Sequence, residues 1–206
     1  MPRIKFTLSI DCDSDEPDRF LLVYDGEILE LEEDSDVDVR IGEVTVYLLQ
    51  RERLLNEGES EFEAMDSLAS STREAYDALL DPETGDWKEE VTDLYEPNFF
   101  TELNLLVIES LKLEPQFRRK GIGAQVVHEI IATLGSSCGI VACKPFPLQY
   151  SGWADKDKAE LRDEPGFEKK RLSAFKKIAQ YWSGLGFQKL PNSDFYVLAP
   201  EFQDVE

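Results

Sequence analysis

A basic, glycine-containing stretch stands between an apolar run and a helical pattern. Arg118, Arg119 and Lys120 precede Gly121 and Gly123. A turn from a strand into a helix leaves the first backbone N–H groups of the helix unpaired, and the helix dipole places partial positive charge at the same end. Glycines let an anion approach the backbone closely, and the three cationic side chains strengthen the positive field. The stretch therefore predicts a phosphate-binding loop.

Two widespread phosphate-binding motifs do not fit this loop. The dinucleotide-binding motif of Rossmann domains requires a third glycine at the position of Val126. The P-loop requires Gly-Lys followed by Ser or Thr, and that sequence is absent. The loop is therefore either a phosphate site of another kind or a basic turn that binds no ligand.

Periodicity predicts a strand before the loop and a helix after it. Residues 105–113 place apolar side chains on both faces, which is typical of a strand buried on both sides, and Pro115 ends the strand. Residues 122–134 repeat apolar side chains at helical spacing, and Gly135 ends that helix. These two elements would hold the loop in the strand-to-helix turn that an anion site needs.

The loop and its surroundings resemble the GNAT superfamily of N-acetyltransferases. Arg118-x-x-Gly121-x-Gly123 is similar to the Arg/Gln-x-x-Gly-x-Gly/Ala signature of that family, and Tyr181–Phe187 is similar to the Phe-Tyr-x-x-Leu-Gly-Phe-like sequence that ends a later helix. The resemblance covers roughly residues 102–199. It implies an α/β (α+β) fold with a mixed, mostly antiparallel central sheet flanked by helices on both faces. It also implies a single domain over residues 1–206, in which the divergent residues 1–100 form the substrate side.

The resemblance further implies a site for acetyl-CoA as co-substrate. In the family, the loop binds the pyrophosphate, and the strand before it pairs with the pantetheine arm. The corresponding cofactor-binding residues are Leu111, Leu113, Arg118, Arg119, Lys120, Gly121, Ile122, Gly123 and Ala124. A backbone N–H near Leu111 or Leu113 would stabilise the oxyanion, and the thioester would lie between Leu111 and Cys143, where the two central strands part. Five later basic residues either meet the 3′-phosphate or are simply solvated: Lys169, Lys170, Arg171, Lys176 and Lys177.

Glu109 is a candidate general base because it is a charged residue in an otherwise apolar strand. Burial would raise the pKa of its carboxyl group, which suits the removal of a proton from an amine. The resemblance also implies a strand carboxylate near this position, as several family members have. The alternative is that Glu109 faces solvent at the strand edge or forms an ion pair.

Tyr181 is the candidate general acid, although it does not stand where the resemblance would place that group. The family often has a tyrosine four residues before the helix-ending glycine, and this chain has Trp182 there. Tyr181 is the neighbouring residue, about 100° away around the helix. Three alternatives are open. Tyr181 supplies the proton, or water protonates the thiolate, whose thiol has an ordinary pKa of about 8.5, or catalysis is lost.

Two other reactive residue types receive structural interpretations. His128, the single histidine, lies on the polar side of its predicted helix, which favours a surface residue. Cys143 ends the apolar run 139–143, a second predicted buried strand, which favours a core thiol. The three cysteines lack the spacing of metal ligands, so no metal site is predicted, and they are typical of reduced thiols in a cytoplasmic protein.

The chain is strongly acidic, and its charge is unevenly distributed. Residues 1–117 contain 9 Lys and Arg against 32 Asp and Glu, and the whole chain has a formal net charge of -21. This charge disfavours nucleic-acid binding, because no basic stripe with interleaved aromatic residues is present. No apolar run is long enough for a membrane helix, and the N-terminus lacks the apolar core of a signal peptide. The acidic half is either a solvated surface or an attractant for a cationic substrate or partner.

Before the loop, the sequence predicts strands and one long helix. The strands are residues 3–10, 20–24, 27–31 and 39–50, with a two-residue turn at Asp25-Gly26, an acidic loop at 32–38 and a bulge at Gly42. A capping pattern at Ser60 and Glu63 begins a helix that Asp81-Pro82 ends. The connection 81–100 carries Trp87, Tyr95, Pro97, Phe99 and Phe100, which either line a substrate cleft or pin the connection to the core.

After the second buried strand, residues 148–168 form a polar insertion that is a lid, a short helix or a solvated excursion. Residues 172–185 predict a helix, and residues 187–190 and 195–198 predict a terminal hairpin.

The resulting functional expectation is an N-acetyltransferase that moves an acetyl or other short acyl group from acyl-CoA to a primary amine. The acceptor would be a small amine or a peptide amine, and the acidic half favours a cationic one. A homodimer is left open. The rival interpretation is a catalytically degenerate protein of the same fold, which binds CoA without turnover or holds a basic partner on its acidic surface.

Overall fold

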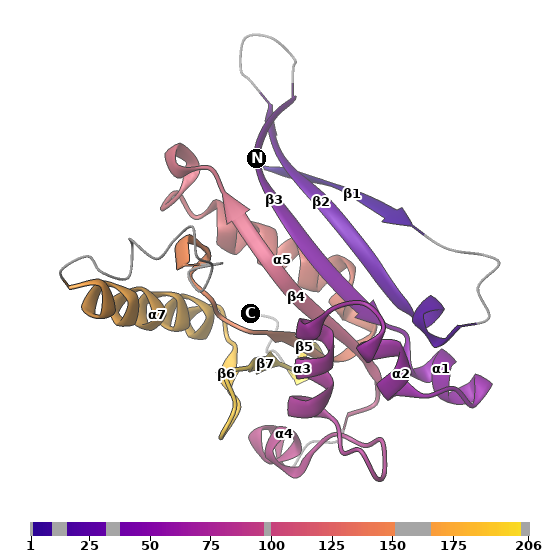
Figure 1. Cartoon of the computed structure of the whole chain (residues 1–206). Helices are drawn as coiled ribbons and strands as arrows, with labels where there is room; N and C mark the ends of the chain where they lie inside the picture. The colour runs from indigo at the N-terminus through magenta and orange to yellow at the C-terminus, as the bar shows by residue number, and fades with distance from the viewer. Residues whose placement is uncertain (1, 10–15, 32–37, 97–99, 151–165, 203–206) are drawn as a thin grey trace.

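A seven-stranded sheet forms the centre of the structure, a computed structural model that describes residues 2–9, 16–31, 38–96, 100–150 and 166–202 (Figure 1). The strand order is β1-β2-β3-β4-β5-β7-β6. Every neighbouring pair is antiparallel except β4 and β5. The strands are β1 Arg3–Ser9, β2 Leu21–Leu31, β3 Asp38–Leu49, β4 Asn104–Leu113, β5 Cys138–Cys143, β6 Gln188–Lys189 and β7 Tyr196–Leu198. The predicted mixed, mostly antiparallel α/β architecture is thereby confirmed.

Helices cover both faces of this sheet. The described α-helices are α1 Arg51–Glu57, α2 Glu61–Asp66, α3 Ser70–Leu79, α4 Glu89–Thr92, α5 Ile122–Thr133 and α7 Phe167–Gly184. In one buried cluster, helices α1, α2, α3 and α4 pack against the face of β4 that carries Leu105 and Val107. A second cluster joins α5 and the end of α7 to the opposite face, which carries Leu106 and Ile108. The strand β4 is therefore buried on both sides, as its sequence predicts.

The predicted turn at Asp25-Gly26 is wrong, because β2 runs through both residues. Gly26 pairs with Phe6 of β1 on one side and with Val44 of β3 on the other. A Cβ atom on Gly26 would lie 2.7 Å from Val44 Cγ1 and 2.8 Å from Phe6 Cε1. The glycine therefore makes room for the side chains of two neighbouring strands, which is the other common use of glycine in a strand.

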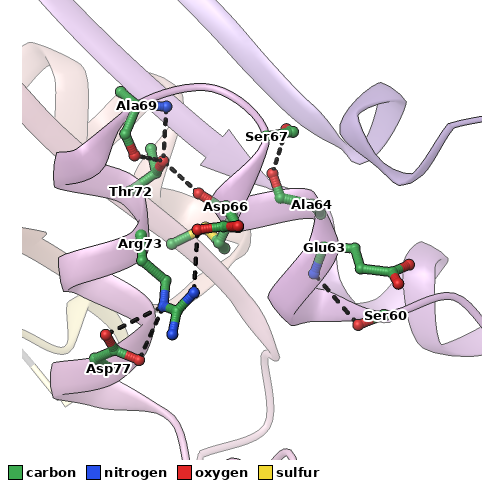
Figure 2. A network of polar contacts seen from close by, with 10 residues as sticks. Ser60, Glu63, Ala64, Asp66, Ser67, Ala69, Thr72, Arg73 and Asp77 are labelled. Atoms are coloured by element: carbon green, nitrogen blue, oxygen red, sulfur yellow. Dashed lines mark hydrogen bonds and ion pairs between the residues drawn. The ribbon is translucent and has the colours of Figure 1, made fainter.

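The single helix predicted from Ser60 to Asp81 is also wrong, because the structure has α2 and α3 there, preceded by α1. The side chain of Thr72 satisfies backbone groups at the break between α2 and α3 (Figure 2). Its Oγ1 accepts a hydrogen bond from the N–H of Ala69 at 3.3 Å and lies 2.5 Å from the carbonyl oxygen of Met65. Such local side-chain bonds compete with a continuous helix.

The cap at the start of α2 is as predicted, since Ser60 Oγ accepts a hydrogen bond from the N–H of Glu63 at 3.3 Å. Arg73 then links the two helices across their break. Its guanidinium lies 3.1 Å from carboxylate oxygens of both Asp66 and Asp77, as Figure 2 shows.

The aromatic residues of the connection 81–100 pack against the core wherever the structure describes them. The Trp87 ring lies under the guanidinium of Arg51, 4.3 Å from its carbon to the ring centroid. Tyr95 contacts Phe100, and Phe100 contacts Phe202, with ring centroids 5.6 and 5.5 Å apart. Pinning the connection to the core is therefore the correct alternative for these residues, whereas Pro97 and Phe99 lie outside the described residues.

The remaining predicted elements agree with the structure, except that the helix predicted over residues 172–185 begins at Phe167, within the predicted insertion 148–168. The strand at 3–10 is β1, the strand at 39–50 is β3, and the bulge expected at Gly42 falls at the neighbouring Ile41, opposite the shift between Ile28 and Leu29. The elements at 105–113, 122–134, 139–143 and 172–185 are β4, α5, β5 and α7, and the terminal hairpin is β6 and β7. Most of the predicted acidic loop and residues 151–165 of the insertion lie outside the described residues. Among the helices that the structure describes, none has the length and apolar character needed to span a bilayer.

Candidate functional site

The two central strands part after Ile108 and Cys143, which form the last pair of their parallel ladder. Beyond this pair β5 ends, whereas β4 continues along β3 to Leu113. No described strand pairs with the other edge of residues 109–113, so a ligand could bind the backbone groups there, except the carbonyl oxygen of Leu113, which accepts a hydrogen bond from Arg118 Nε. A bound extended chain could complete this edge as an added strand does.

A cavity of about 360 Å³ lies where the strands part. Its walls come from four places in the chain: residues 108–113 of β4, the loop before α5 with the first turn of that helix, the segment 143–148 after β5, and the last part of α7. The lining is mostly apolar, as in most small-molecule sites. The predicted phosphate loop and the predicted parting of the strands therefore meet in one cavity.

The loop enters α5 through two residues with left-handed backbone geometry. Arg119 has a φ of 62°, and Gly121, the N-cap of α5, has a φ of 80°. The first hydrogen bond of the helix runs from the N–H of Gln125 to the carbonyl oxygen of Gly121 at 3.2 Å. The N–H groups of residues 122–124 are thus the unpaired donors of the first turn. Arg118 Nε donates to the carbonyl oxygen of Leu113 at 2.7 Å, which ties the loop to the end of β4.

Most of the residues predicted to bind the cofactor line this cavity. They are Leu111, Leu113, Arg118, Arg119, Gly121, Gly123 and Ala124. Two predicted residues place their side chains elsewhere. The ammonium of Lys120 lies over the ring of Phe117, 5.2 Å from its centroid, and the side chain of Ile122 is buried in the core under α5. These two residues can contribute only backbone groups and long-range charge to the cavity.

Glu109 lies in the wall of the cavity at a bulge in β4. Ser110 pairs with Thr45 and Ile108 pairs with Val46, so Glu109 is the extra residue between them. Its side chain is half-buried, and within the described part of the chain no group forms a hydrogen bond or ion pair with it. Burial raises the pKa of Tyr47 on the adjacent strand, and the negative charges of Glu109 and Asp25 raise it further. The wall of the cavity therefore carries a carboxylate that has no hydrogen-bond or ion-pair partner among the described residues.

Tyr181 reaches the cavity from α7 and places its hydroxyl beside the first turn of α5. A Cβ atom on Gly123 would lie only 2.7 Å from Tyr181 Oη. This oxygen is buried, and no group in the described ranges forms a hydrogen bond with it. Burial raises the pKa of the phenol, which keeps it protonated. Trp182 also lines the cavity, and it packs edge-on against Phe187 with ring centroids 5.1 Å apart.

Several lining residues were not predicted from the sequence. Ser110 follows Glu109 on β4, Lys144 and Phe146 follow β5, and Ile178 precedes Tyr181 by three residues on α7. The helical spacing of Ile178 and Tyr181 is a signal that they share a face. Nothing local indicates that the segment after β5 folds over the end of β4, because that contact depends on the tertiary arrangement.

The other residues considered as candidates for catalysis, phosphate binding or metal binding are His128, Cys143 and the five basic residues of α7. His128 is exposed on the polar side of α5, as expected. Cys143 is buried, and burial raises the pKa of its thiol well above the ordinary range, so it is a protonated core residue that also lines the cavity. None of the five basic residues named for the 3′-phosphate lines this cavity. Among the residues that the structure describes, no group of His, Cys, Asp and Glu side chains could hold a metal ion.

Neither a scan against models of known protein families nor a search of curated proteins finds a match for this chain. The chemistry of the site therefore rests on its own geometry. One end carries unpaired helix N–H groups and cations, the middle is an apolar channel with an open strand edge, and a carboxylate stands in the wall. This arrangement suits an elongated ligand with an anionic end and an amide-containing arm.

Proposed function

We propose that this protein is an acyltransferase of the GNAT type, which moves an acetyl or other short acyl group from acyl-CoA to a primary amine. The observation that carries the proposal is the cavity at the parting of β4 and β5, which extends from the pair Ile108 and Cys143 to the first turn of α5, whose N–H groups have no partner within the helix. The strand order, with a single parallel pair at its centre, supports it. The sequence resemblance of residues 118–123 supports it independently.

The cavity fits the parts of acyl-CoA in order. The diphosphate would accept hydrogen bonds from the N–H groups of residues 122–124, with Arg118 and Arg119 neutralising its charge. The pantetheine arm carries amides, and it would pair with the open edge of residues 109–113. The strand is about 16 Å long from Ile108 to Leu113, and this is the length of edge along which the arm would lie. The thioester would then reach the inner part of the gap, between Leu111 and Cys143.

The residues in the wall can support direct transfer of the acyl group. A neutral amine attacks the thioester carbonyl carbon, the amide bond forms, and the carbon–sulfur bond breaks. A backbone N–H on the open edge of β4, near Leu111 or Leu113, stabilises the oxyanion. Glu109 takes the proton that the amine loses, directly or through water. The thiolate leaves as a fair leaving group, because the ordinary pKa of a thiol is about 8.5.

A thiol-release assay tests this function. The protein and acetyl-CoA are incubated with a panel of amines that includes diamines, amino sugars and lysine-containing peptides. We expect CoA thiol to appear in proportion to acetylated amine, and we expect cationic acceptors to lead because the chain has a net charge of -21. Buried thiols and the acidic composition fit a cytoplasmic enzyme, which completes the proposal.

A second candidate is a protein of this fold that binds CoA without turnover or holds a basic partner. The observation in its favour is Trp182, which is buried in the cavity wall. It stands where the family often has a tyrosine, and its indole cannot protonate the leaving thiolate as a general acid would. This candidate predicts CoA binding without thiol release from any amine. It also predicts a complex with a basic partner that weakens with salt, because surface charges are screened over about 10 Å at 0.1 M salt.

A further inference from the structure

The hydroxyl of Tyr181 is a buried polar group without a partner among the residues that the structure describes. Its oxygen is fully buried in the described structure and makes no hydrogen bond. Leaving a buried hydroxyl unpaired is costly, so such groups in native proteins usually have a partner in water or a ligand. Tyr181 is one of the residues that line the cavity. A ligand in that cavity is therefore the natural partner.

The position of the hydroxyl identifies which part of a ligand it meets. Tyr181 Oη lies 2.7 Å from the point where a Cβ atom of residue 123 would stand, so any other residue at this position would force the hydroxyl to move. Gly123 belongs to the first turn of α5, whose N–H groups lack partners within the helix. The hydroxyl therefore lies beside the helix turn that carries these N–H groups, and the cations Arg118 and Arg119 line the same cavity. Neighbouring donors and cations together favour an anion.

We propose that Tyr181 is a diphosphate-binding residue, which donates a hydrogen bond from its hydroxyl to the acyl-CoA diphosphate held at the first turn of α5. This inference rests on the proposed function, and it assigns Tyr181 a role in binding instead of the role of general acid. The thiolate then departs without a proton from the protein and is protonated by water.

The acid–base properties of the two groups agree with this assignment. An ordinary tyrosine has a pKa of about 10 and an ordinary thiol about 8.5, so the transfer of a proton from the phenol to the thiolate is unfavourable. Burial raises the pKa of Tyr181 further, which makes that transfer less favourable still. The same shift keeps the phenol in its donor form throughout the neutral range. A donor to a phosphate needs only this form.

The test compares Tyr181→Phe with the wild type, and Tyr24→Phe serves as the matched control. Tyr24 lies on β2 and packs edge-on against Phe6, away from the cavity. Calorimetric titration is carried out with CoA and with desulfo-CoA, which retains the diphosphate but lacks the sulfur. We expect Tyr181→Phe to weaken both ligands by the same factor, about tenfold, since a hydrogen bond to a charged group is lost. We expect Tyr24→Phe to bind both ligands as the wild type does.

Kinetics with acetyl-CoA separate the two roles. The inference predicts that Tyr181→Phe raises KM for acetyl-CoA about tenfold and leaves kcat and its pH profile unchanged. A lower kcat with an altered basic limb of the pH profile would overturn it, because that is the behaviour of a general acid. Unchanged affinity for both ligands, or a loss for CoA only, would overturn it as well. Failure of the wild type to bind either ligand would overturn the proposed function itself, and the inference with it.

Discussion

Ile108 and Cys143 form the last pair of the parallel ladder between β4 and β5, and the cavity begins at this pair. Both side chains are almost completely buried, at 2% and 1% exposure, so they close the inner end of the gap. The open edge of β4 and the first turn of α5, the proposed anion site, lie on the outer side. This pair of residues therefore limits how far a bound chain can enter the gap between β4 and β5.

Because Cys143 closes the gap, we predict that its size limits the length of the acyl group. Cys143→Ala removes the sulfur atom from the inner end of the cavity and leaves the backbone of β5 unchanged. We expect kcat/KM for butyryl-CoA relative to acetyl-CoA to rise about tenfold, in the range expected for added methylene groups in an apolar pocket. Cys138→Ala is the matched control, since Cys138 is also buried on β5 but does not line the cavity. Equal ratios in the two variants would contradict the prediction.

Glu109→Gln tests the carboxylate at the bulge of β4. Removing a general base typically lowers the rate at least about hundredfold, so we expect kcat/KM for the amine to fall by about that factor. CoA affinity should stay the same, because the proposed diphosphate site lies at the other end of the cavity. Glu43→Gln is a suitable control, since Glu43 lies on the adjacent strand in ion pairs with Lys112 and Arg40. Full activity of Glu109→Gln would remove Glu109 from the mechanism.

The pH dependence of stability should show the burial of Cys138. Burial raises the pKa of its thiol from 9.0 to about 12 in the folded protein. The unfolded chain therefore loses this proton first, and the contribution of the buried thiol to stability is complete below pH 9 and declines as the pH rises toward 12. We expect the free energy of unfolding, measured with urea between pH 8 and pH 10.5, to fall less steeply in Cys138→Ala than in the wild type. Parallel curves for the two proteins would contradict this assignment.

Arg51 should be one of the most important single residues for stability. Its Nε lies 2.6 Å from Glu61 Oε1 in a buried ion pair, and its guanidinium also donates to the carbonyl oxygen of Leu103 at 3.0 Å. Arg51→Met leaves the Glu61 carboxylate buried without its partner, which typically costs about 3–5 kcal/mol. Arg53→Met, which breaks an exposed pair with Glu57, should cost less than about 1 kcal/mol. Urea unfolding measures the free energy of unfolding of both variants. Similar decreases in the two would contradict the prediction that the buried ion pair contributes more to stability than the exposed one.

Local patterns were sufficient to predict the loop and the elements beside it. The apolar run before Pro115, the helical spacing after Gly121 and the two glycines are all properties of neighbouring residues, and β4 and α5 lie within one residue of the predicted bounds. The parting of β4 and β5 followed from the family resemblance, and the structure has it at Ile108 and Cys143. Sequence also identified the part of the cavity wall that lies between Glu109 and Ala124, because one continuous segment contributes it.

The wrong predictions have physical causes that the pattern of neighbouring residues does not show. The pair Asp25-Gly26 has the composition of a tight turn, but Gly26 is needed to accommodate Phe6 and Val44 from the flanking strands. The helix expected from Ser60 breaks because Thr72 bonds to the backbone at the end of α2, an interaction that hydrophobic periodicity does not register. The contributions of Phe146 and Ile178 to the cavity depend on how distant segments pack.

Calorimetric titration of acetyl-CoA into the wild type, Gly123→Glu and Gly184→Glu tests the central claim most directly. Gly123→Glu places a side chain and a negative charge at the first turn of α5, whereas a Cβ atom on Gly184 meets no atom within 4 Å. The proposed site predicts that the wild type and Gly184→Glu bind with equal affinity and that Gly123→Glu does not bind. Absence of heat and of a thermal shift in the wild type, or equal binding by all three proteins, would contradict the assignment of this cavity to acyl-CoA.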